Sequence, residues 1–245
     1  MCNSVFPCRL LSGGGNTKAA MRTLVALVIS ALPLVFIQAG ESIALPLIGP
    51  RNAADYKADF SNKLDDGWIF VRQDKSQWRL RDGAVELLAQ PSNIWARQNN
   101  DTKNLLLRPL PGDHFAVEVT VDFTPRKEYE QAGLIIYLDD DNYLKFDREL
   151  FAGQSCTLVL ESGAKPKVVK KIPFREGRLR LRLEIAEGRV RAFVKTPEET
   201  QWTAHGETQL PGLVDKLKLG LFALGGDANA PRWARFTDFS MSRDE

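Results

Sequence analysis

The chain has 245 residues, a length that favours one large domain over a mini-domain or two full domains. Hydrophobic residues make up 44% of it and charged residues 26%, a balance that excludes a disordered chain. Lys and Arg number 33 against 31 Asp and Glu, with no basic or acidic block, so nucleic acid is not an expected partner. Two histidines exclude a multi-histidine metal site, and three cysteines exclude a disulfide scaffold.

The N-terminal region has the pattern of a secretory signal peptide. An apolar run over residues 23–39 follows Arg22, and cleavage is expected after Ala44 or after Ala39. The alternative is a transmembrane anchor, but the run is shorter than the ~20 residues that a membrane span prefers, and Pro33 lies inside it. We therefore expect a secreted or periplasmic protein that meets a membrane only through the uncleaved signal.

This pattern divides the chain into an N-terminal extension with the signal over residues 1–44, a lead-in over 45–54 and one domain over 55–243. Two of the three cysteines fall in the first part, which leaves Cys156 for the domain. A disulfide within the domain is then impossible. Because Cys156 sits among alternating apolar residues, we expect a buried, inert thiol.

Hydrophobic alternation with a period of two predicts strands throughout the domain. Over residues 115–123, Phe and Val occupy every second position, with Glu118, Thr120 and Asp122 between them, which is typical of a strand with one buried face. Residues 178–185 and 190–195 repeat the pattern, and Glu187-Gly188 between them predicts a tight hairpin. The predicted core residues of these strands are Phe115, Val117, Val119, Val121, Phe123, Leu181, Leu183, Val190 and Val194.

Eight further runs fit the same pattern, and turn residues such as Gly, Asp and Asn separate them. The runs cover residues 84–88, 105–108, 133–138, 143–147, 157–161, 167–172, 217–224 and 234–241. Many short strands at near-regular spacing indicate an all-β sandwich or barrel. The one helical element that we expect is a single turn in residues 211–215.

Three stretches resemble a known β-sandwich family. They are Asp59-Phe60 with Gly67-Trp68 and Trp78–Gly83, then Glu130–Tyr137 with Asp139–Lys145, and finally Ala234–Phe239. Together they resemble the concanavalin A-like domain appended to family 43 β-xylosidases, and equally the stand-alone family known as domain of unknown function 1349. The resemblance covers residues 55–243, and the second stretch is its most specific part.

The resemblance implies an all-β fold, a two-sheet antiparallel jelly-roll sandwich of the concanavalin A-like type with one concave sheet. In such sandwiches the concave face often holds carbohydrate, so carbohydrate is the expected partner of a monomeric protein. The resemblance does not imply catalysis, because a domain of this length cannot also hold the catalytic propeller of those xylosidases.

Glu118, Thr120 and Asp122 share the strand face opposite to the predicted core. Sandwich-fold glycanases use carboxylates at alternate strand positions as nucleophile and acid. Their motifs place an acid where this chain has Thr120, so the motif is broken and we predict no catalytic residue. The three residues are instead interpreted as a solvated polar face that can hydrogen-bond sugars.

Aromatic side chains are further candidates, because the C–H faces of sugar rings stack on them. Trp95 lies in a loop that enters a strand and is the best exposed candidate, while Tyr143 shares a strand face with Lys145. The loop around Trp202 is an alternative location. The predicted ligand-binding residues are Trp95, Glu118, Thr120, Asp122, Tyr143 and Lys145.

We predict no cofactor and no metal-binding residue, with a structural calcium ion as the alternative. Asp139–Asn142 offers oxygen ligands, but a hairpin turn explains it without a metal. Asp59 and Asp238, towards the two ends of the domain, are the other carboxylates that a calcium ion would use. His114 and His205 are interpreted as ordinary surface or loop residues.

Basic residues form a stripe if the predicted hairpin pairs as drawn. Its members are Arg180, Arg182, Arg191 and Lys195, with Glu184 nearby. Such a stripe suits an anionic polysaccharide such as a uronate. The alternative is a solubilising face with cross-strand acidic partners.

These observations favour a secreted, non-catalytic concanavalin A-like domain that binds carbohydrate. Two alternatives stay open: a glycoside hydrolase or other sugar-active enzyme on the same fold, and a structural or adaptor protein that docks a partner through one sheet face. Paired carboxylates in a groove, one with a raised pKa, would favour the enzyme. A flat apolar outer face would favour the adaptor.

Overall fold

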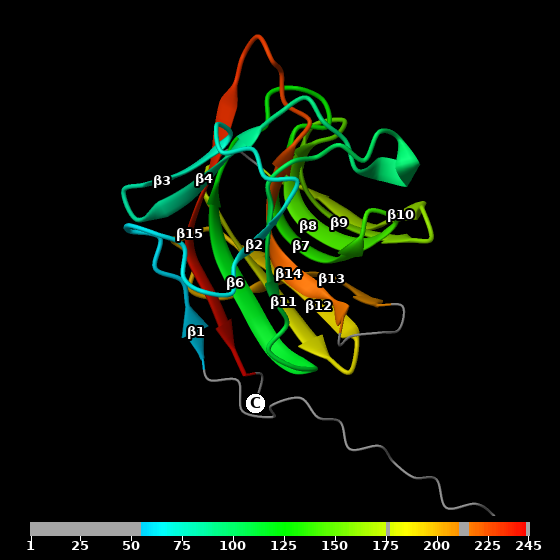
Figure 1. The fold of residues 1–245 in the computed structure, drawn as a ribbon. Coiled ribbons are helices and arrows are strands. Elements are labelled where there is room, and N and C mark those ends of the chain that lie inside the picture. The colour runs from blue at the N-terminus through cyan, green and yellow to red at the C-terminus, as the bar shows by residue number, and fades with distance from the viewer. Residues whose placement is uncertain (1–54, 175–176, 211–215, 244–245) are drawn as a thin grey trace, which may run out of the picture. The chain divides into compact units, whose positions relative to one another are not determined.

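The structure, a computed structural model, describes residues 55–174, 177–210 and 216–243, which form two antiparallel sheets (Figure 1). The first, sheet A, has eight strands, and β1 (Tyr56–Lys57) pairs with β15 beside its main path. That path runs β13 (Thr203–Gln209), β12 (Arg189–Lys195), β11 (Leu179–Ala186), β6 (His114–Asp122), β15 (Arg232–Ser242), β4 (Ala84–Ala89) and β3 (Trp78–Arg81).

The second sheet, sheet B, has seven strands. Its order is β10 (Lys165–Pro173), β9 (Gln154–Ser162), β8 (Asn142–Leu150), β7 (Gln131–Asp139), β14 (Lys218–Leu224), β5 (Leu105–Pro109) and β2 (Ile69–Val71). Consecutive strands β7, β8, β9 and β10 pair as hairpins, whereas β14 and β5 join from distant parts of the chain. The predicted two-sheet antiparallel sandwich is therefore confirmed.

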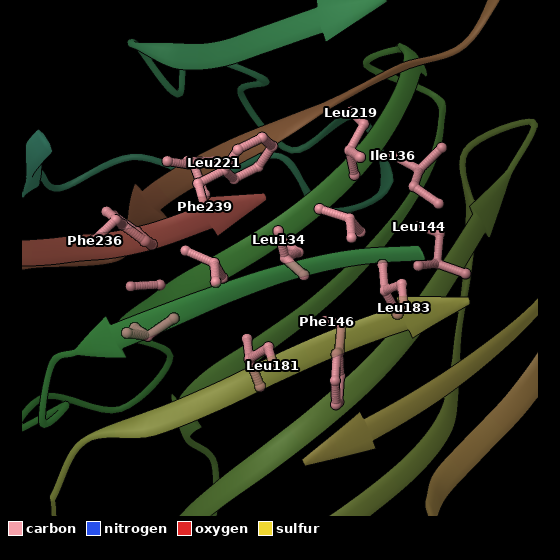
Figure 2. Packing of buried hydrophobic residues seen from close by; sticks show 14 of the residues in the cluster. Leu134, Ile136, Leu144, Phe146, Leu181, Leu183, Leu219, Leu221, Phe236 and Phe239 are labelled. Atoms are coloured by element: carbon pink, nitrogen blue, oxygen red, sulfur yellow. The ribbon is translucent and has the colours of Figure 1, made fainter. Parts of the chain in front are cut away.

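The main core lies between the two sheets, where the apolar faces of the strands meet (Figure 2). Leu134 and Phe146 of sheet B pack in one cluster with Leu181 and Phe236 of sheet A. Every predicted core residue of residues 115–123, 181–183 and 190–194 is buried. Burial of these side chains supplies the hydrophobic stabilisation that a domain without disulfides needs. Cys156 is also buried and free, as predicted.

The hairpin between β11 and β12 has the predicted turn. Glu187 and Gly188 both have positive φ angles, 50° and 78°, as a two-residue type I′ turn requires. Across this hairpin Leu183 pairs with Ala192, and across the neighbouring pair of strands it faces Val117. The register thus places all three buried side chains on one face of sheet A.

Four observed strands were not predicted: β1, β2, β3 and β13. The first three have two to four residues, too few for an alternation to be recognised. Strand β13 is an edge strand with the sequence Thr-Ala-His-Gly-Glu-Thr-Gln, in which a single residue, His205, is buried. Hydrogen bonding to β12, rather than its own hydrophobic pattern, makes this segment a strand.

The described residues contain no α-helix. The 3-10 turn η1 (Trp95–Arg97) was not predicted, and Lys216 is also in 3-10 conformation. None of their helices is long and apolar enough to cross a membrane. The predicted extension and signal over residues 1–44, the lead-in over 45–54 and the predicted turn over 211–215 lie outside the described residues.

Candidate functional site

The face of sheet B that points away from the core carries a group of buried polar side chains. Alternation along β8 places Tyr143, Lys145, Asp147 and Glu149 on this face, because Leu144 and Phe146 belong to the core. The register then adds neighbours from β7 and β9. We call six of these residues the polar cluster: Gln131, Lys145, Asp147, Glu149, Ser155 and Thr157.

Hydrogen bonds connect most of the polar cluster. Lys145 Nζ donates to Gln131 Oε1, and Gln131 Nε2 donates to Glu149 Oε1 over 2.6 Å. Ser155 Oγ donates to the backbone carbonyl of Glu149 and lies 3.3 Å from Thr157 Oγ1. All six side chains are buried, so these bonds form away from water.

Asp147 is the exception, because neither of its carboxyl oxygens has a hydrogen-bond partner. Its nearest cation is Lys145, whose Nζ lies 3.8 Å from Asp147 Oδ2. Burial raises the pKa of Asp147 to about 8, against the lowering effect of Lys145 and with a smaller raising effect of Glu149. A buried carboxyl group without donors is costly, and it is a site at which a ligand hydroxyl group can bind.

One end of this face is covered by the segment that carries Trp95. The backbone N–H of Ala96 donates to both carboxylate oxygens of Glu161, over 3.1 and 3.2 Å, and Tyr143 Oη donates to Glu161 Oε2 over 2.6 Å. Burial, followed by this bond to Glu161, raises the pKa of the Tyr143 phenol. The half-buried Trp95 ring centroid lies 5.9 Å from Lys145 Nζ. The structure therefore brings Trp95, Tyr143 and Lys145 together.

Two further aromatic rings lie at the opposite end of the face. Tyr129, which is 55% exposed, lies 5.7 Å from Phe151 between ring centroids. Lys171 Nζ lies 4.3 Å from the Phe151 ring centroid, and Lys171 pairs with Thr157 of the polar cluster in the sheet register. Tyr129 has a φ angle of 65°, and its N–H donates to the Leu150 carbonyl over 2.7 Å. A strained backbone thus holds an exposed aromatic ring in place.

Glu118, Thr120 and Asp122 lie elsewhere, on the outer face of sheet A. Glu118 accepts bonds from Arg180 and Arg182, each over 2.6 Å. The structure therefore separates the six predicted ligand-binding residues into two groups of three on opposite faces of the sandwich.

The predicted basic stripe is neutralised in part by acidic neighbours on sheet A. Besides its bond to Glu118, Arg182 pairs with Glu184 over 2.9 Å, and Glu184 also pairs with Arg191 over 2.7 Å. Lys195 lies 4.8 Å from the ring of Trp202. These contacts match the alternative of a solubilising face with cross-strand partners.

The carboxylates of the turn Asp139–Asn142, which were considered for calcium, are engaged in other contacts. Asp140 binds Arg72 through both oxygens, Asp141 pairs with Arg97, and Asp139 accepts bonds from the turn. Among the residues that the structure describes, no group of three or more His, Cys, Asp or Glu side chains is placed to hold a metal ion. Calcium binding stays an untested alternative.

The interpretation of His205 as a surface or loop residue is wrong. It lies on β13 with 3% exposure, and its ring packs 4.9 Å from the Phe146 ring between centroids. Burial lowers the pKa of His205 to about 4. His114, in contrast, is exposed beside Asp113. The polar sequence of β13 gave no sign that one of its residues faces the core.

Several residues on the outer face of sheet B were not predicted. Glu149 continues the alternation of Tyr143 and Lys145, but the predicted strand ended at Asp147. Gln131 and Thr157 lie opposite residues of β8, and register across a sheet cannot be read from one strand. Tyr129 lies in a loop, where no periodic pattern applies.

Comparisons with known proteins agree with this architecture. Residues 57–242 match the family model described as the β-xylosidase C-terminal concanavalin A-like domain. None of the curated proteins compared with the chain matches it. The resemblance to the domain of unknown function 1349 family stays a prediction.

Solved structures share the fold. A mutant of the GH43 protein BlXynB from Bacillus licheniformis is 24% identical with a TM-score of 0.71, over 77% of this chain and 39% of that one. Xylan β-1,4-xylosidase from Bacillus halodurans is 18% identical with a TM-score of 0.67, over 79% and 40%. A functionally unknown protein from Saccharomyces cerevisiae is 18% identical with a TM-score of 0.62, over 73% and 97%.

The chain thus spans about two fifths of the length of these two bacterial proteins and nearly the whole length of the yeast protein. At such identities the likeness shows the fold alone. The family model, in contrast, extends over well more than half of the chain and from β1 to β15. The chain therefore belongs to the β-xylosidase C-terminal concanavalin A-like domain family.

Proposed function

We propose that this protein is an exported, non-catalytic domain that binds a glycan on the outer face of sheet B. The observation that carries the proposal is Asp147, a buried carboxyl group with no hydrogen-bond partner in a cluster of amide, ammonium and hydroxyl groups. Sugar hydroxyls can donate to such a carboxyl group and accept from Lys145. The proposed export depends on the signal pattern of residues 1–44.

Aromatic rings at both ends of this face support a glycan as the ligand. Trp95 lies near the Tyr143 end of β8, and Tyr129 with Phe151 lies near its Glu149 end. Six residue steps of a strand separate Tyr143 from Glu149, about 20 Å. Rings that flank a polar floor can stack on the C–H faces of sugar units while the floor binds their hydroxyls.

The floor of this site is closed, with 2% exposure for Lys145 and 0% for Asp147. We therefore propose that a glycan first contacts Trp95 and Tyr129 and reaches the polar cluster when the Trp95 segment moves. The exposed ion pair of Arg97 with Asp141, 2.6 Å long, holds that segment only weakly. Opening also breaks the bonds from Ala96 to Glu161.

The relatives suggest which glycans to test. One solved structure is that of a xylan β-1,4-xylosidase, and another is titled a GH43B protein of a Bacteroides ovatus xyloglucan locus. We therefore propose linear β-1,4-linked chains, of xylose or of glucose, as the ligand class.

Calorimetric titration of the full-length protein with xylohexaose and cellohexaose tests the proposal. We expect one of them to bind, and we expect Asp147→Ala and Trp95→Ala each to weaken binding about tenfold, the usual effect of losing a buried partner or a stacked ring. Glu207→Gln, an exposed change on sheet A, is the matched control. Absence of binding to both chains and to other plant, algal and bacterial polysaccharides would contradict the proposal.

Glycoside hydrolysis is a second candidate, because Asp147 and Glu149 lie on one strand face and the pKa of Asp147 is raised. Against it, Glu149 is engaged by Gln131 and neither carboxyl group is exposed. We expect no release of reducing sugar from the two hexasaccharides. Turnover that Asp147→Asn abolishes would establish the enzyme instead.

A further inference from the structure

A hollow lies on the other side of the sandwich, on the outer face of sheet A. It has a volume of about 360 Å³, and Lys57, Arg178 and Arg180 line it together with Thr120, Ser240 and Asp238. These residues come from β1, β6, β11 and β15 and from the segment before β11. In the register Lys57 pairs with Ser240, and Thr120 pairs with Arg180.

An irregularity in β15 accompanies this hollow. The register of β15 against β6 shifts between Thr237 and Ser240, and Asp238 within the shift has a φ angle of 54°. Such a bulge bends a strand and redirects its side chains, and bulges are frequent next to binding sites. The hollow is therefore associated with a specific feature of the fold.

The cations of the hollow are not fully neutralised. Lys57 makes no ion pair with any other described residue. Arg178 pairs with Asp122 only over 3.5 Å, and both side chains are exposed. Arg180 donates to Glu118, but its Nε is buried and has no partner. An anion in the hollow can accept from the ammonium group of Lys57 and from the guanidinium groups of Arg178 and Arg180.

Two of the lining residues, Arg180 and Thr120, are held in place before any ligand arrives. Glu118 holds Arg180 at 2.6 Å, and the ring of Trp202 lies 5.6 Å from the Arg180 guanidinium carbon. The hydroxyl group of Thr120 is held on the central strand β6, with 5% exposure. Pre-positioned donors lose little conformational entropy when they bind a ligand.

We propose that this hollow binds an oxyanion group of a glycan, the carboxylate of a uronic acid or a sulfate ester. Guanidinium and ammonium groups form charge-assisted hydrogen bonds to both, and Thr120 and Ser240 supply hydroxyl groups for the remaining oxygens. Asp238 lines the same hollow and can accept from a sugar hydroxyl group. That the anion is carried by a glycan rests on the proposed function, whereas anion binding itself does not.

Calorimetric titration of the full-length protein at low ionic strength tests the inference, with sodium glucuronate, sodium sulfate and neutral glucose as probes. We expect glucuronate or sulfate to bind and glucose not to bind in the hollow. The double variant Lys57→Gln, Arg178→Gln should weaken anion binding at least about tenfold, as loss of charge-assisted bonds predicts. Both side chains are exposed, so the variant should fold. Arg189→Gln, an equally exposed arginine on sheet A, is the control.

Tighter binding of glucuronate would identify the carboxylate, and tighter binding of sulfate would identify the sulfate ester. Polygalacturonate and a sulfated galactan then test whether the anion is carried by a glycan. Binding of the free anions without binding of either polysaccharide would overturn the claim that the ligand is a glycan. Equal losses in the double variant and in Arg189→Gln, or no anion binding, would overturn the site. Retention of hexasaccharide binding by the double variant would show that such a failure leaves the sheet B proposal intact.

Discussion

Two opposing electrostatic effects act on the carboxyl group of Asp147. Burial favours its neutral form, and the ammonium group of Lys145, 3.8 Å away, favours its charged form. The balance lies with burial, so the carboxyl group keeps its proton up to about pH 8 in the folded protein. In the unfolded chain it would lose the proton near its ordinary pKa of about 3.9.

The stability contributed by Asp147 should therefore fall with rising pH. Between about pH 4 and pH 8 the folded state binds more protons than the unfolded state, so each rise in pH favours unfolding. The free energy of unfolding of Asp147→Asn, taken relative to that of the natural protein, should rise by more than about 1 kcal/mol from pH 5 to pH 8. Urea unfolding at both pH values measures this.

Asp82→Asn is the control for this experiment, because Asp82 is an exposed turn residue. Its difference from the natural protein should be the same at pH 5 and pH 8. If Asp147→Asn behaves like this control, the carboxyl group ionises in the folded state as it does in the unfolded one, and Lys145 outweighs burial.

His205 should make the stability of the protein fall as the pH falls, the opposite of the trend for Asp147. Burial lowers its pKa to about 4, so between pH 6.5 and pH 4 the unfolded state binds more protons and stability falls as the pH falls. His205→Phe keeps an aromatic ring beside Phe146. Its free energy of unfolding, taken relative to that of the natural protein, should rise by about 1–3 kcal/mol as the pH falls from 7 to 4.5. Thermal unfolding across this range tests it. His114→Gln, a change at an exposed histidine, is the control and should show no such trend.

At the scale of elements, the strands with alternation were predictable and those held by their neighbours were not. Strand β6 has four alternating core positions, which decide both its existence and its buried face. Strand β13 has a single buried side chain, so its pairing with β12 depends on backbone hydrogen bonds that no residue pattern reports. Length was the other limit: the predicted 143–147 strand extends to Leu150 and so adds Glu149 to the site.

Close approach of two strands gives a prediction for β7. A Cβ atom on Gly133 would lie 2.3 Å from the Phe146 carbonyl oxygen and 2.6 Å from Asp147 Cα. Both are backbone atoms of β8, which has a neighbouring strand on each side, and they cannot move aside without breaking the sheet. We expect Gly133→Ala to cost about 2–4 kcal/mol of stability or to prevent folding, measured by urea unfolding. Gly112→Ala, with no atom within 4 Å, should change stability little.

At the scale of the whole molecule, the sandwich assigns the predicted site residues to two surfaces. For the five site residues on strands, alternation correctly predicted the face opposite to the core, but it could not say which sheet each strand joins. That assignment needs long-range pairing, such as that of β6 between β11 and β15. Tyr143 and Lys145 therefore share a surface with Trp95, whereas Glu118 belongs to a surface of paired charges.

The length of the sheet B face makes a prediction about ligand size. About 20 Å separates its two ends along β8, so a single sugar unit cannot contact Trp95 and Tyr129 at once. We expect affinity to rise from xylobiose to xylohexaose, or along the corresponding glucose series, because longer chains reach the second aromatic end. Calorimetric titration with each chain length measures the trend.

Tyr129→Ala should remove this gain for the long chains, by about 1–2 kcal/mol, and leave the short chains unchanged. Tyr129→Phe keeps the ring and should keep the gain, which separates stacking from any bond of the hydroxyl group. Trp95→Ala should weaken short and long chains alike, because Trp95 lies beside Lys145 and the polar cluster. Affinity that is independent of chain length, with Tyr129→Ala equal to the natural protein, would confine binding to the Trp95 end and leave the Tyr129–Phe151 pair outside the site.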